Sequence, residues 1–260
     1  MIIDDLVAAT KRRVAREKQL VTYEEIKNQA LSMAITDDFT FEAALRKPGV
    51  SFICEVKKAS PSKGVIASDF DFLKVAREYE QAGADAISVL TEPDYFQGHI
   101  DYLKAIHQEV SLPLLRKDFI IDDYMIYQAK VYGASAVLLI ASILDDETLS
   151  SYLSLTQTLG LSALVEAHNP EEIEKAVKAG ARMIGINNRD LRDFSVDIHN
   201  SLRYRHLIPE DVVFVSESGI ENREQIIELE QNNVQAVLIG ETMMRAQDKQ
   251  SLIKTLRGQL

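Results

Sequence analysis

Short apolar runs alternate with amphipathic stretches along most of the chain, and one such unit recurs. The clearest copies are residues 81–90, 131–140 and 178–187, with a weaker copy at 231–240. Each copy places a Gly or Asn, suited to the left-handed end of a helix, before an apolar strand; these residues are Gly83, Gly133, Gly180 and Asn233. Their spacing of about 50 residues matches two strand–helix units, so one more strand is expected between successive copies.

Apolar runs at the expected places complete a set of eight strands. Residues 112–117, 162–166 and 212–217 fill the gaps between copies, and residues 51–57 come first. Helical patterns such as 72–81 and 170–179 separate them, which indicates parallel pairing. Eight such units predict an α/β fold of the (β/α)8 TIM-barrel type.

The chain is expected to form a single domain over residues 1–260, with an N-terminal helical extension over 1–45 and the barrel over 46–260. Thr22 and Glu25 have the spacing of a capping box that opens a helix. Apolar residues such as Leu6, Val14 and Ile26 give the extension contacts to make. We expect it to cover one barrel mouth; a loose tail, or packing on the outer helices, is the alternative.

Composition and charge argue against several classes of function. The net charge of −11 argues against a nucleic-acid or anionic-membrane partner. No apolar run approaches the roughly 20 residues of a membrane span, and residues 1–16 lack the core of a secretory signal. The single cysteine, Cys54, suits the cytoplasm and should be an inert core thiol. The five histidines lack metal-ligand spacing, and no nucleotide-binding loop occurs, so neither a metal nor a cofactor is expected.

Polar residues at the strand ends are the candidate chemistry, because barrel active sites lie at the carboxyl ends of the strands. Alternation of side chains along each strand predicts an inward-facing set of two lysines, three carboxylates and an amide: Glu55, Lys57, Lys117, Glu166, Asn187 and Glu217. Such mixed charge can shift pKa values and transfer protons. A satisfied ion-pair network is the alternative. Other basic residues near strand ends, among them Arg116 and Arg189, add to a local positive charge, although alternation turns the side chain of Arg116 out of the barrel.

The last two strand ends resemble a phosphate site. Barrels commonly bind phosphate through backbone N–H groups of the loops after strands seven and eight and through a short helix. Here those loops contain Ser218, Gly219, Gly240 and Glu241, and the glycines let the backbone approach an anion closely. Ordinary turn chemistry would explain each glycine alone.

These motifs together resemble the indole-3-glycerol-phosphate synthase family. The matching segments run in order through the barrel: Glu-Val-Lys-Lys-Ala-Ser-Pro-Ser at 55–62, Ser-Val-Leu-Thr-Glu at 88–92, Tyr-Phe-Gln-Gly at 95–98, Pro-Leu-Leu-Arg-Lys-Asp-Phe at 113–119, Leu-Val-Glu at 164–166, Gly-Ile-Asn-Asn-Arg-Asp-Leu at 185–191, Ser-Glu-Ser-Gly-Ile at 216–220 and Ile-Gly-Glu-Thr at 239–242. The resemblance implies a carboxy-lyase of tryptophan biosynthesis. It would convert 1-(2-carboxyphenylamino)-1-deoxyribulose 5-phosphate to indole-3-glycerol phosphate, with loss of CO2 and water and without a cofactor.

The resemblance also implies roles for individual residues. Lys117 matches the general acid, Glu166 the acid/base carboxylate, and Lys57 the lysine beside the substrate's carboxylate and phosphate. Positions matching supporting, phosphate-binding and apolar pocket residues are Glu55, Asn187, Glu217, Ser60, Arg189, Ser218, Gly219, Gly240, Glu241, Phe96, Phe119, Leu138 and Leu191. We expect a monomeric cytoplasmic enzyme acting on a small sugar-phosphate substrate.

The sequence departs from the family pattern in two places, and two other functions have to be weighed against this one. His168 follows the motif carboxylate, where the family often has a small polar residue, and the chain has no Trp for an aromatic lid. An isomerase of phosphoribosyl intermediates would also use a phosphate-binding barrel, but it leaves the 55–62 motif unexplained. A non-enzymatic sugar-phosphate sensor would be expected to lose strand-end groups, and all are present here.

Overall fold

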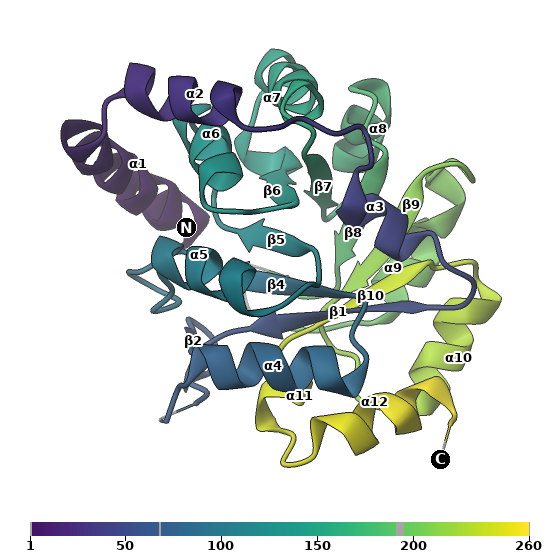
Figure 1. Ribbon diagram of the computed structural model, residues 1–260. Coiled ribbons are helices and arrows are strands. Elements are labelled where there is room, and N and C mark those ends of the chain that lie inside the picture. Colours follow the sequence, from purple (N-terminus) through teal and green to yellow (C-terminus); the bar gives the residue numbers. More distant parts are fainter. Residues whose placement is uncertain (1, 68, 191–194, 260) are drawn as a thin grey trace.

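Eight parallel strands form a closed barrel in the computed structural model, which describes residues 2–67, 69–190 and 195–259 (Figure 1). The strands are β1 (Ser51–Val56), β4 (Ala86–Leu90), β5 (Leu114–Lys117), β6 (Ala136–Ile140), β7 (Ser162–Ala167), β8 (Met183–Asn187), β9 (Val213–Glu217) and β10 (Ala236–Ile239). They follow one another around the barrel, and β10 pairs with β1 to close it, Ser51 opposite Ala236. The predicted (β/α)8 fold is confirmed.

Helices connect the strands and cover the barrel from outside (Figure 1). They are α4 (Phe72–Ala82), α5 (Ile100–Glu109), α6 (Tyr124–Val131), α7 (Asp146–Thr158), α8 (Pro170–Lys178), α9 (His199–Tyr204), α10 (Arg223–Gln231), α11 (Glu241–Arg245) and α12 (Lys249–Arg257), with short 3-10 turns at η1 (Ala141–Ile143) and η2 (Arg205–Leu207). None of the helices described is long and apolar enough to cross a membrane.

The repeated turn residues have the backbone conformation that the sequence predicts. Gly83, which ends α4, has a φ of 86°, and Asn233, after α10, has a φ of 54°. Both lie in the left-handed region, which Gly and Asn adopt more readily than other residues. The chain therefore leaves each of these helices sharply and enters the next strand.

Side chains alternate between two apolar layers. Ile53, Leu115 and Leu164 belong to the cluster inside the barrel. Cys54 faces the other way, into the layer between strands and helices, and is fully buried. Burial raises the pKa of the Cys54 thiol, so it stays protonated and acts as a core residue, as predicted.

The segment before β1 forms three helices, which contact different parts of the barrel (Figure 1). Helix α1 (Ile2–Leu20) reaches the catalytic mouth with Leu6, and α2 (Tyr23–Ser32), which opens with the predicted Thr22 capping box, packs beside α6. Helix α3 (Thr40–Leu45) buries Phe41 and Leu45 completely within the cluster inside the barrel. The expected mouth cover therefore corresponds to α1, and the alternative of packing on an outer helix corresponds to α2.

Candidate active site

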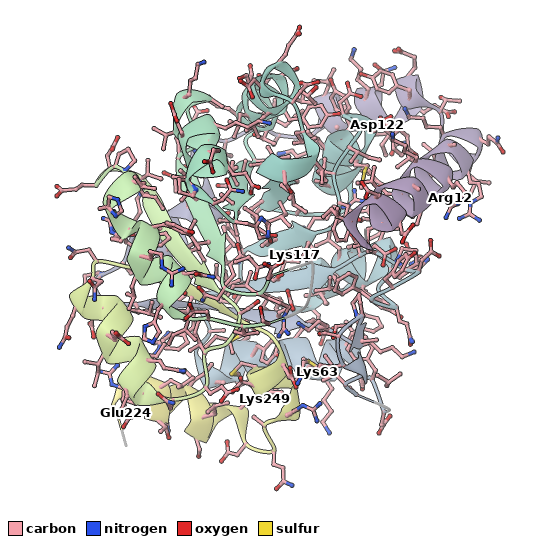
Figure 2. The ribbon with its side chains drawn as sticks, turned by 180° about the vertical axis from the view of Figure 1, so that it is seen from behind. Arg12, Lys63, Lys117, Asp122, Glu224 and Lys249 are labelled. Carbon is pink, nitrogen blue, oxygen red and sulfur yellow. The ribbon has the colours of Figure 1, made fainter. Side chains whose placement is uncertain are left out.

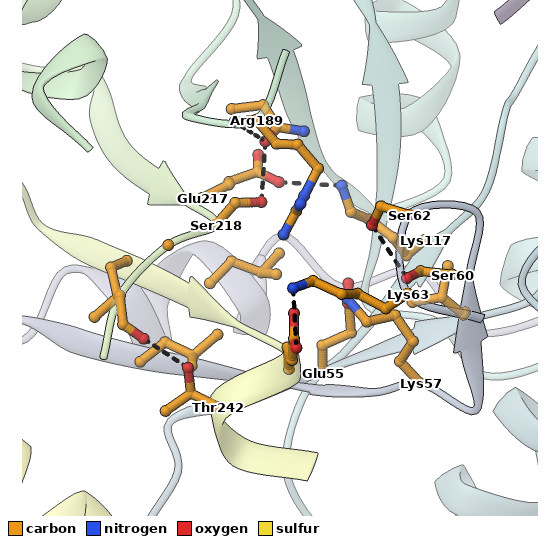
Figure 3. Close-up of a pocket in the computed structure, with 18 of the residues that line it drawn as sticks. Glu55, Lys57, Ser60, Ser62, Lys63, Lys117, Arg189, Glu217, Ser218 and Thr242 are labelled. Carbon is orange, nitrogen blue, oxygen red and sulfur yellow. Dashed lines mark hydrogen bonds and ion pairs between the residues drawn. The ribbon is translucent and has the colours of Figure 1, made fainter. Parts of the chain in front are cut away.

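The carboxyl ends of the strands surround a cavity of about 1080 Å³ (Figure 3). The short hairpin of β2 (Ala59–Ser60) and β3 (Gly64–Val65) follows β1, and residues 60–63 line one side of the cavity. All the site residues predicted from the sequence that the structure describes line this cavity: Glu55, Lys57, Ser60, Phe96, Lys117, Phe119, Leu138, Glu166, Asn187, Arg189, Glu217, Ser218, Gly219, Gly240 and Glu241. The remaining one, Leu191, lies outside the described residues.

Lys117 lies at the centre of the site, held between two carboxylates. Its Nζ is 2.7 Å from Glu166 Oε2 and 3.0 Å from Glu217 Oε2. Figure 3 shows the contact with Glu217, and Figure 2 shows Lys117 near the middle of the molecule. Burial by itself lowers the pKa of Lys117, but the charges of Glu166, Glu217 and Glu55 outweigh it and raise the pKa above its usual range. The ammonium therefore keeps its proton until a strong base forms next to it.

The two carboxylates around Lys117 differ in environment. Burial by itself raises the pKa of Glu166, but Lys117 and His168 outweigh it and lower the pKa below its usual range. Burial raises the pKa of Glu217, and the nearby charges of Glu166 and Glu55 add to this effect. One ammonium thus lies between Glu166, whose pKa is lowered, and Glu217, whose pKa is raised, an arrangement suited to acid–base chemistry.

Glycines make room for two of these carboxylates. A Cβ on Gly185 would collide with Glu217 Oε1, an oxygen that is buried without a hydrogen-bond partner among the described residues. A Cβ on Gly240 would lie 2.5 Å from Glu55 Oε1 and 2.7 Å from Lys57 Nζ. Those two atoms form an ion pair of 2.6 Å. The glycine at the end of β10 therefore has a second task besides any contact with phosphate.

Asn187 links Glu166 to the loop after β9. Its Nδ2 donates to Glu166 Oε1 at 3.3 Å, and its Oδ1 accepts from Ser218 Oγ and from the backbone N–H of Arg189, both at 3.0 Å. Ser218 has a φ of 72°, which is unusual for a residue with a side chain. Strained backbone of this kind is common at functional sites, and here it turns the hydroxyl of Ser218 toward Asn187.

The opposite wall of the cavity is apolar. The rings of Phe96 and Phe119 have centroids 6.1 Å apart, and Leu138 lies in the same cluster. Leu6 of α1 joins this cluster and is only 2% exposed. The loop that carries Phe96 is held by Glu92, whose carboxylate accepts three backbone N–H groups of residues 94–96. An aryl ring could be enclosed between this wall and the charged groups.

The loops after β9 and β10 line one side of the cavity, and the Thr242 hydroxyl donates to the carbonyl of Ile220 between them. Gly219 has a φ of 82° and packs under Val196, which also lines the cavity. The carboxylate of Glu241 is engaged by Arg245 at 3.1 Å and approached by Lys63 at 3.8 Å. An anion here would meet backbone and the cations Lys63, Arg189 and Arg245, all of which line the cavity.

One sequence-based grouping is wrong, and three residues were missed. Arg116 does not add to the charge of the mouth: it is 1% exposed and binds Asp118, Thr91 and the carbonyl of Met125 outside the barrel. Leu6 and Val196 were not expected in the cavity, because their positions depend on how distant segments dock. His168 was noted only as a departure from the family; its ring reaches Glu166. Its i+2 spacing from Glu166, directly after the end of β7, could have signalled this.

No group of metal-binding side chains occurs in the part of the chain that the structure describes.

Comparisons with known proteins agree with this geometry. The family model for indole-3-glycerol phosphate synthase matches residues 3–256. Proteins named indole-3-glycerol phosphate synthase from Lachnoclostridium phytofermentans and Leuconostoc mesenteroides are 51% and 50% identical, and each alignment covers 100% of both chains. One from Endomicrobium trichonymphae is 54% identical over 95% of both.

Solved structures resemble the fold at lower identity. A 3-hexulose-6-phosphate synthase from Salmonella typhimurium superposes with a TM-score of 0.66 at 14% identity, covering 81% of this chain and 98% of that one. This likeness supports the barrel alone. The family match along almost the entire chain and the relatives near 50% identity confirm the resemblance drawn from the motifs: the chain belongs to the indole-3-glycerol phosphate synthase family.

Proposed function

We propose that the residues at the barrel mouth divide the family's reaction among them as follows. The enzyme is a carboxy-lyase of tryptophan biosynthesis, an indole-3-glycerol-phosphate synthase. Its substrate is 1-(2-carboxyphenylamino)-1-deoxyribulose 5-phosphate. The observation that carries the division of roles is the position of Lys117 between Glu166 and Glu217, with Glu55 and Lys57 on the adjoining strand.

Ring closure requires a proton donor. The aryl carbon that bears the carboxylate attacks the ketone carbon, and negative charge develops on the ketone oxygen. The Lys117 ammonium donates its proton to that oxygen, because the alkoxide is a stronger base than the amine that forms. The apolar wall of Phe96, Phe119 and Leu138 holds the aryl ring. The new iminium accepts the electron pair that CO2 leaves behind, so the chemistry needs no separate electron sink.

Dehydration then completes the indole. The hydroxyl made in the first step leaves as water after receiving a proton, and a base removes the hydrogen from the carbon next to the ring nitrogen. We assign the base role to Glu166, which is ionised, and a dehydration role to Lys57. Two protons are donated and one is recovered, so each turnover takes one proton from solvent. Glu55 and Asn187 hold Lys57 and Glu166 in place.

The phosphate of the substrate would bind where the last two barrel loops meet. Backbone N–H groups near Gly219 and Gly240, supported by Ser218, Ser60 and Arg189, suit a dianion. The carboxylate of Glu241 is an unsuitable phosphate ligand, so we assign the contact at this position to its backbone. This arrangement places the ribulose chain between the phosphate and Lys117.

The assay follows indole absorbance or fluorescence after the carboxyphenylamino-deoxyribulose phosphate is added without cofactor. Wild type should turn over, and Glu166→Gln should lose kcat by about 10²-fold or more with little change in KM, because the amide keeps the shape but accepts no proton. Glu147→Gln, an exposed glutamate on α7, is the matched control. A rise in KM alone would make Glu166 a binding residue and would move the base elsewhere, with Glu55 the next candidate.

We also propose that the enzyme acts as a cytoplasmic monomer. The groups assigned to the reaction, from Glu55 to Glu217, meet at the mouth of a single barrel, so the proposed chemistry does not call for a residue from a second copy. Sedimentation at micromolar concentration should give one species of about the 29.2 kDa chain mass. A dimer that persists on dilution would contradict the monomer.

A further inference from the structure

His168 has a defined place beside Glu166. It follows Ala167, the last residue of β7, and lies two residues after Glu166; its imidazole lies between two carboxylates. The Nε2 atom is 3.3 Å from Glu166 Oε1, an ion-pair contact without the alignment of a hydrogen bond. The Nδ1 atom is 3.1 Å from Glu172 Oε2.

Glu172 is itself fixed. It is in the first turn of α8, and its carboxylate accepts the backbone N–H of His168 at 2.9 Å and the side-chain N–H of Asn169 at 2.7 Å. Asn169 caps the same helix by accepting the backbone N–H of Glu172. The ring of His168 is therefore oriented by a carboxylate that the start of a helix holds in position.

We propose that His168 is a positioning residue that keeps the carboxylate of Glu166 ionised and oriented through the catalytic cycle, with Glu172 holding the imidazole in place. The inference rests on the acid–base role proposed for Glu166. It assigns to this enzyme a carboxylate–imidazole–carboxylate unit, Glu172–His168–Glu166, behind the base.

Such a residue is needed because Lys117 loses its positive charge during the proposed reaction. In the resting site Lys117 neutralises Glu166 through Oε2. Once Lys117 gives its proton to the ketone oxygen it is a neutral amine, and a carboxylate buried to 3% exposure would lose its cation. An unpaired buried charge is costly and tends to take up a proton. His168 contacts the other oxygen, Oε1, and is not consumed in that step.

The charge of His168 is consistent with this role. Burial by itself lowers the pKa of His168, but Glu166 and Glu172 outweigh it and raise the pKa to about 10. The charged groups that face the ring are Glu166 from β7 and Glu172 from α8; Lys117 of β5 lies beyond Glu166. The imidazole is therefore a cation throughout the neutral pH range.

A merely structural role can be separated from this one. At the start of α8, the backbone N–H of His168 donates to the carboxylate of Glu172, and any residue other than proline keeps this bond. His168→Gln thus preserves the cap and the approximate reach of the side chain but removes the positive charge. His206→Gln, an exposed histidine on η2, is the matched control.

The pH profile of kcat is the test. In His168→Gln we expect kcat at neutral pH to fall by about 10-fold or more, KM to change less than about twofold, and the acid limb that reports protonation of Glu166 to move up by about one pH unit or more. Glu172→Gln should move the limb in the same direction by a smaller amount. A His168→Gln enzyme with wild-type kcat and an unmoved limb would overturn the proposal, as would a change confined to KM or to thermal stability.

Two further measurements test the charge of His168 directly and separate this inference from the role proposed for Glu166. Histidine NMR of the full chain should show one imidazole titrating near pH 10, absent in His168→Gln and lowered by at least about one unit in Glu166→Gln; if the signal that disappears in His168→Gln titrates near 6.5 in wild type, the proposal is overturned. If Glu166→Gln is slow while His168→Gln matches wild type, only the present inference fails. If Glu166→Gln itself retains wild-type turnover, the base assignment and this inference fail together.

Discussion

Arg13 provides a direct way to test how α1 is attached to the catalytic mouth. Its guanidinium donates to Asp118 Oδ1 at 2.7 Å and to the carbonyl of Thr91 at 3.1 Å. Both side chains are buried, with 8% exposure for Arg13 and 0% for Asp118. Arg13→Met would remove the charge and keep much of the apolar stem, so the change isolates the ion pair.

The expected loss of folding free energy depends on which partners Asp118 keeps when Arg13 is replaced. Without Arg13 the carboxylate still binds Arg116 at 3.2 Å, the Thr91 hydroxyl at 2.5 Å and the backbone N–H of Phe119 at 2.8 Å. The charge is therefore not left alone, and the loss should stay below the roughly 3–5 kcal/mol of a broken isolated buried pair. We expect about 2–3 kcal/mol, the scale of one hydrogen bond to a charged group with a weaker one beside it.

Thermal unfolding and kinetics should both register the change. A loss of about 2–3 kcal/mol would lower Tm by about 4–10 °C in a chain of this size if α1 unfolds with the barrel. If α1 opens alone, its amides should exchange faster and KM should rise, because Leu6 would leave the apolar wall. Arg12→Met, the exposed neighbour, is the control (Figure 2). An Arg13→Met enzyme with the Tm, exchange and KM of Arg12→Met would refute the reasoning.

Three other predictions concern the N-terminal segment, a glycine and pH. Deleting residues 1–33 removes α1 and α2 but keeps α3 with Phe41 and Leu45, so it should raise KM or lower kcat while the barrel still folds; unchanged kinetics by the indole assay, or loss of the folded circular-dichroism signal, would contradict this. Gly240→Ala should displace the Glu55–Lys57 pair and lower kcat by about 10²-fold; weaker product binding by calorimetry with normal kcat would show that the glycine serves only the phosphate. The pKa of His168 is about 10 when folded and about 6.5 in model peptides, so its contribution to the free energy of unfolding should be complete below pH 6.5 and lost as pH rises to 10. Urea titrations should therefore show a smaller decline over that range in His168→Gln than in wild type, and equal declines would contradict the assignment.

The barrel was predictable because its sequence signals are local and repeated. Left-handed turn residues such as Gly83 and Asn233 mark the helix ends, and apolar runs follow them at a constant spacing. Alternation along single strands was enough to direct Glu55, Lys57 and Lys117 into the mouth, because a side chain's face depends only on its place in the strand.

The features of the site that the sequence did not predict depend on how segments distant in the chain pack together. Alternation correctly turned Arg116 away from the interior, but only the docked structure shows it tied to Asp118 rather than adding charge to the mouth. Leu6 reaches the cavity because α1 crosses to β5, over a separation of more than 100 residues, through Arg13. The space that Gly240 leaves for the Glu55–Lys57 pair requires β1 beside β10, which follows from barrel closure and not from either segment alone.

The measurement that tests the central claim most directly is turnover of Lys117→Ala on the carboxyphenylamino-deoxyribulose phosphate, read as indole fluorescence. Lys47→Ala, an exposed lysine 58% accessible and near Asp85, serves as the control. With the ammonium gone, the cation assigned to protonate the ketone oxygen is missing, and kcat should fall by about 10²–10⁴-fold while the barrel remains folded. A folded Lys117→Ala enzyme that keeps more than about a tenth of wild-type turnover would contradict the account, because that loss lies below the range expected for a general acid.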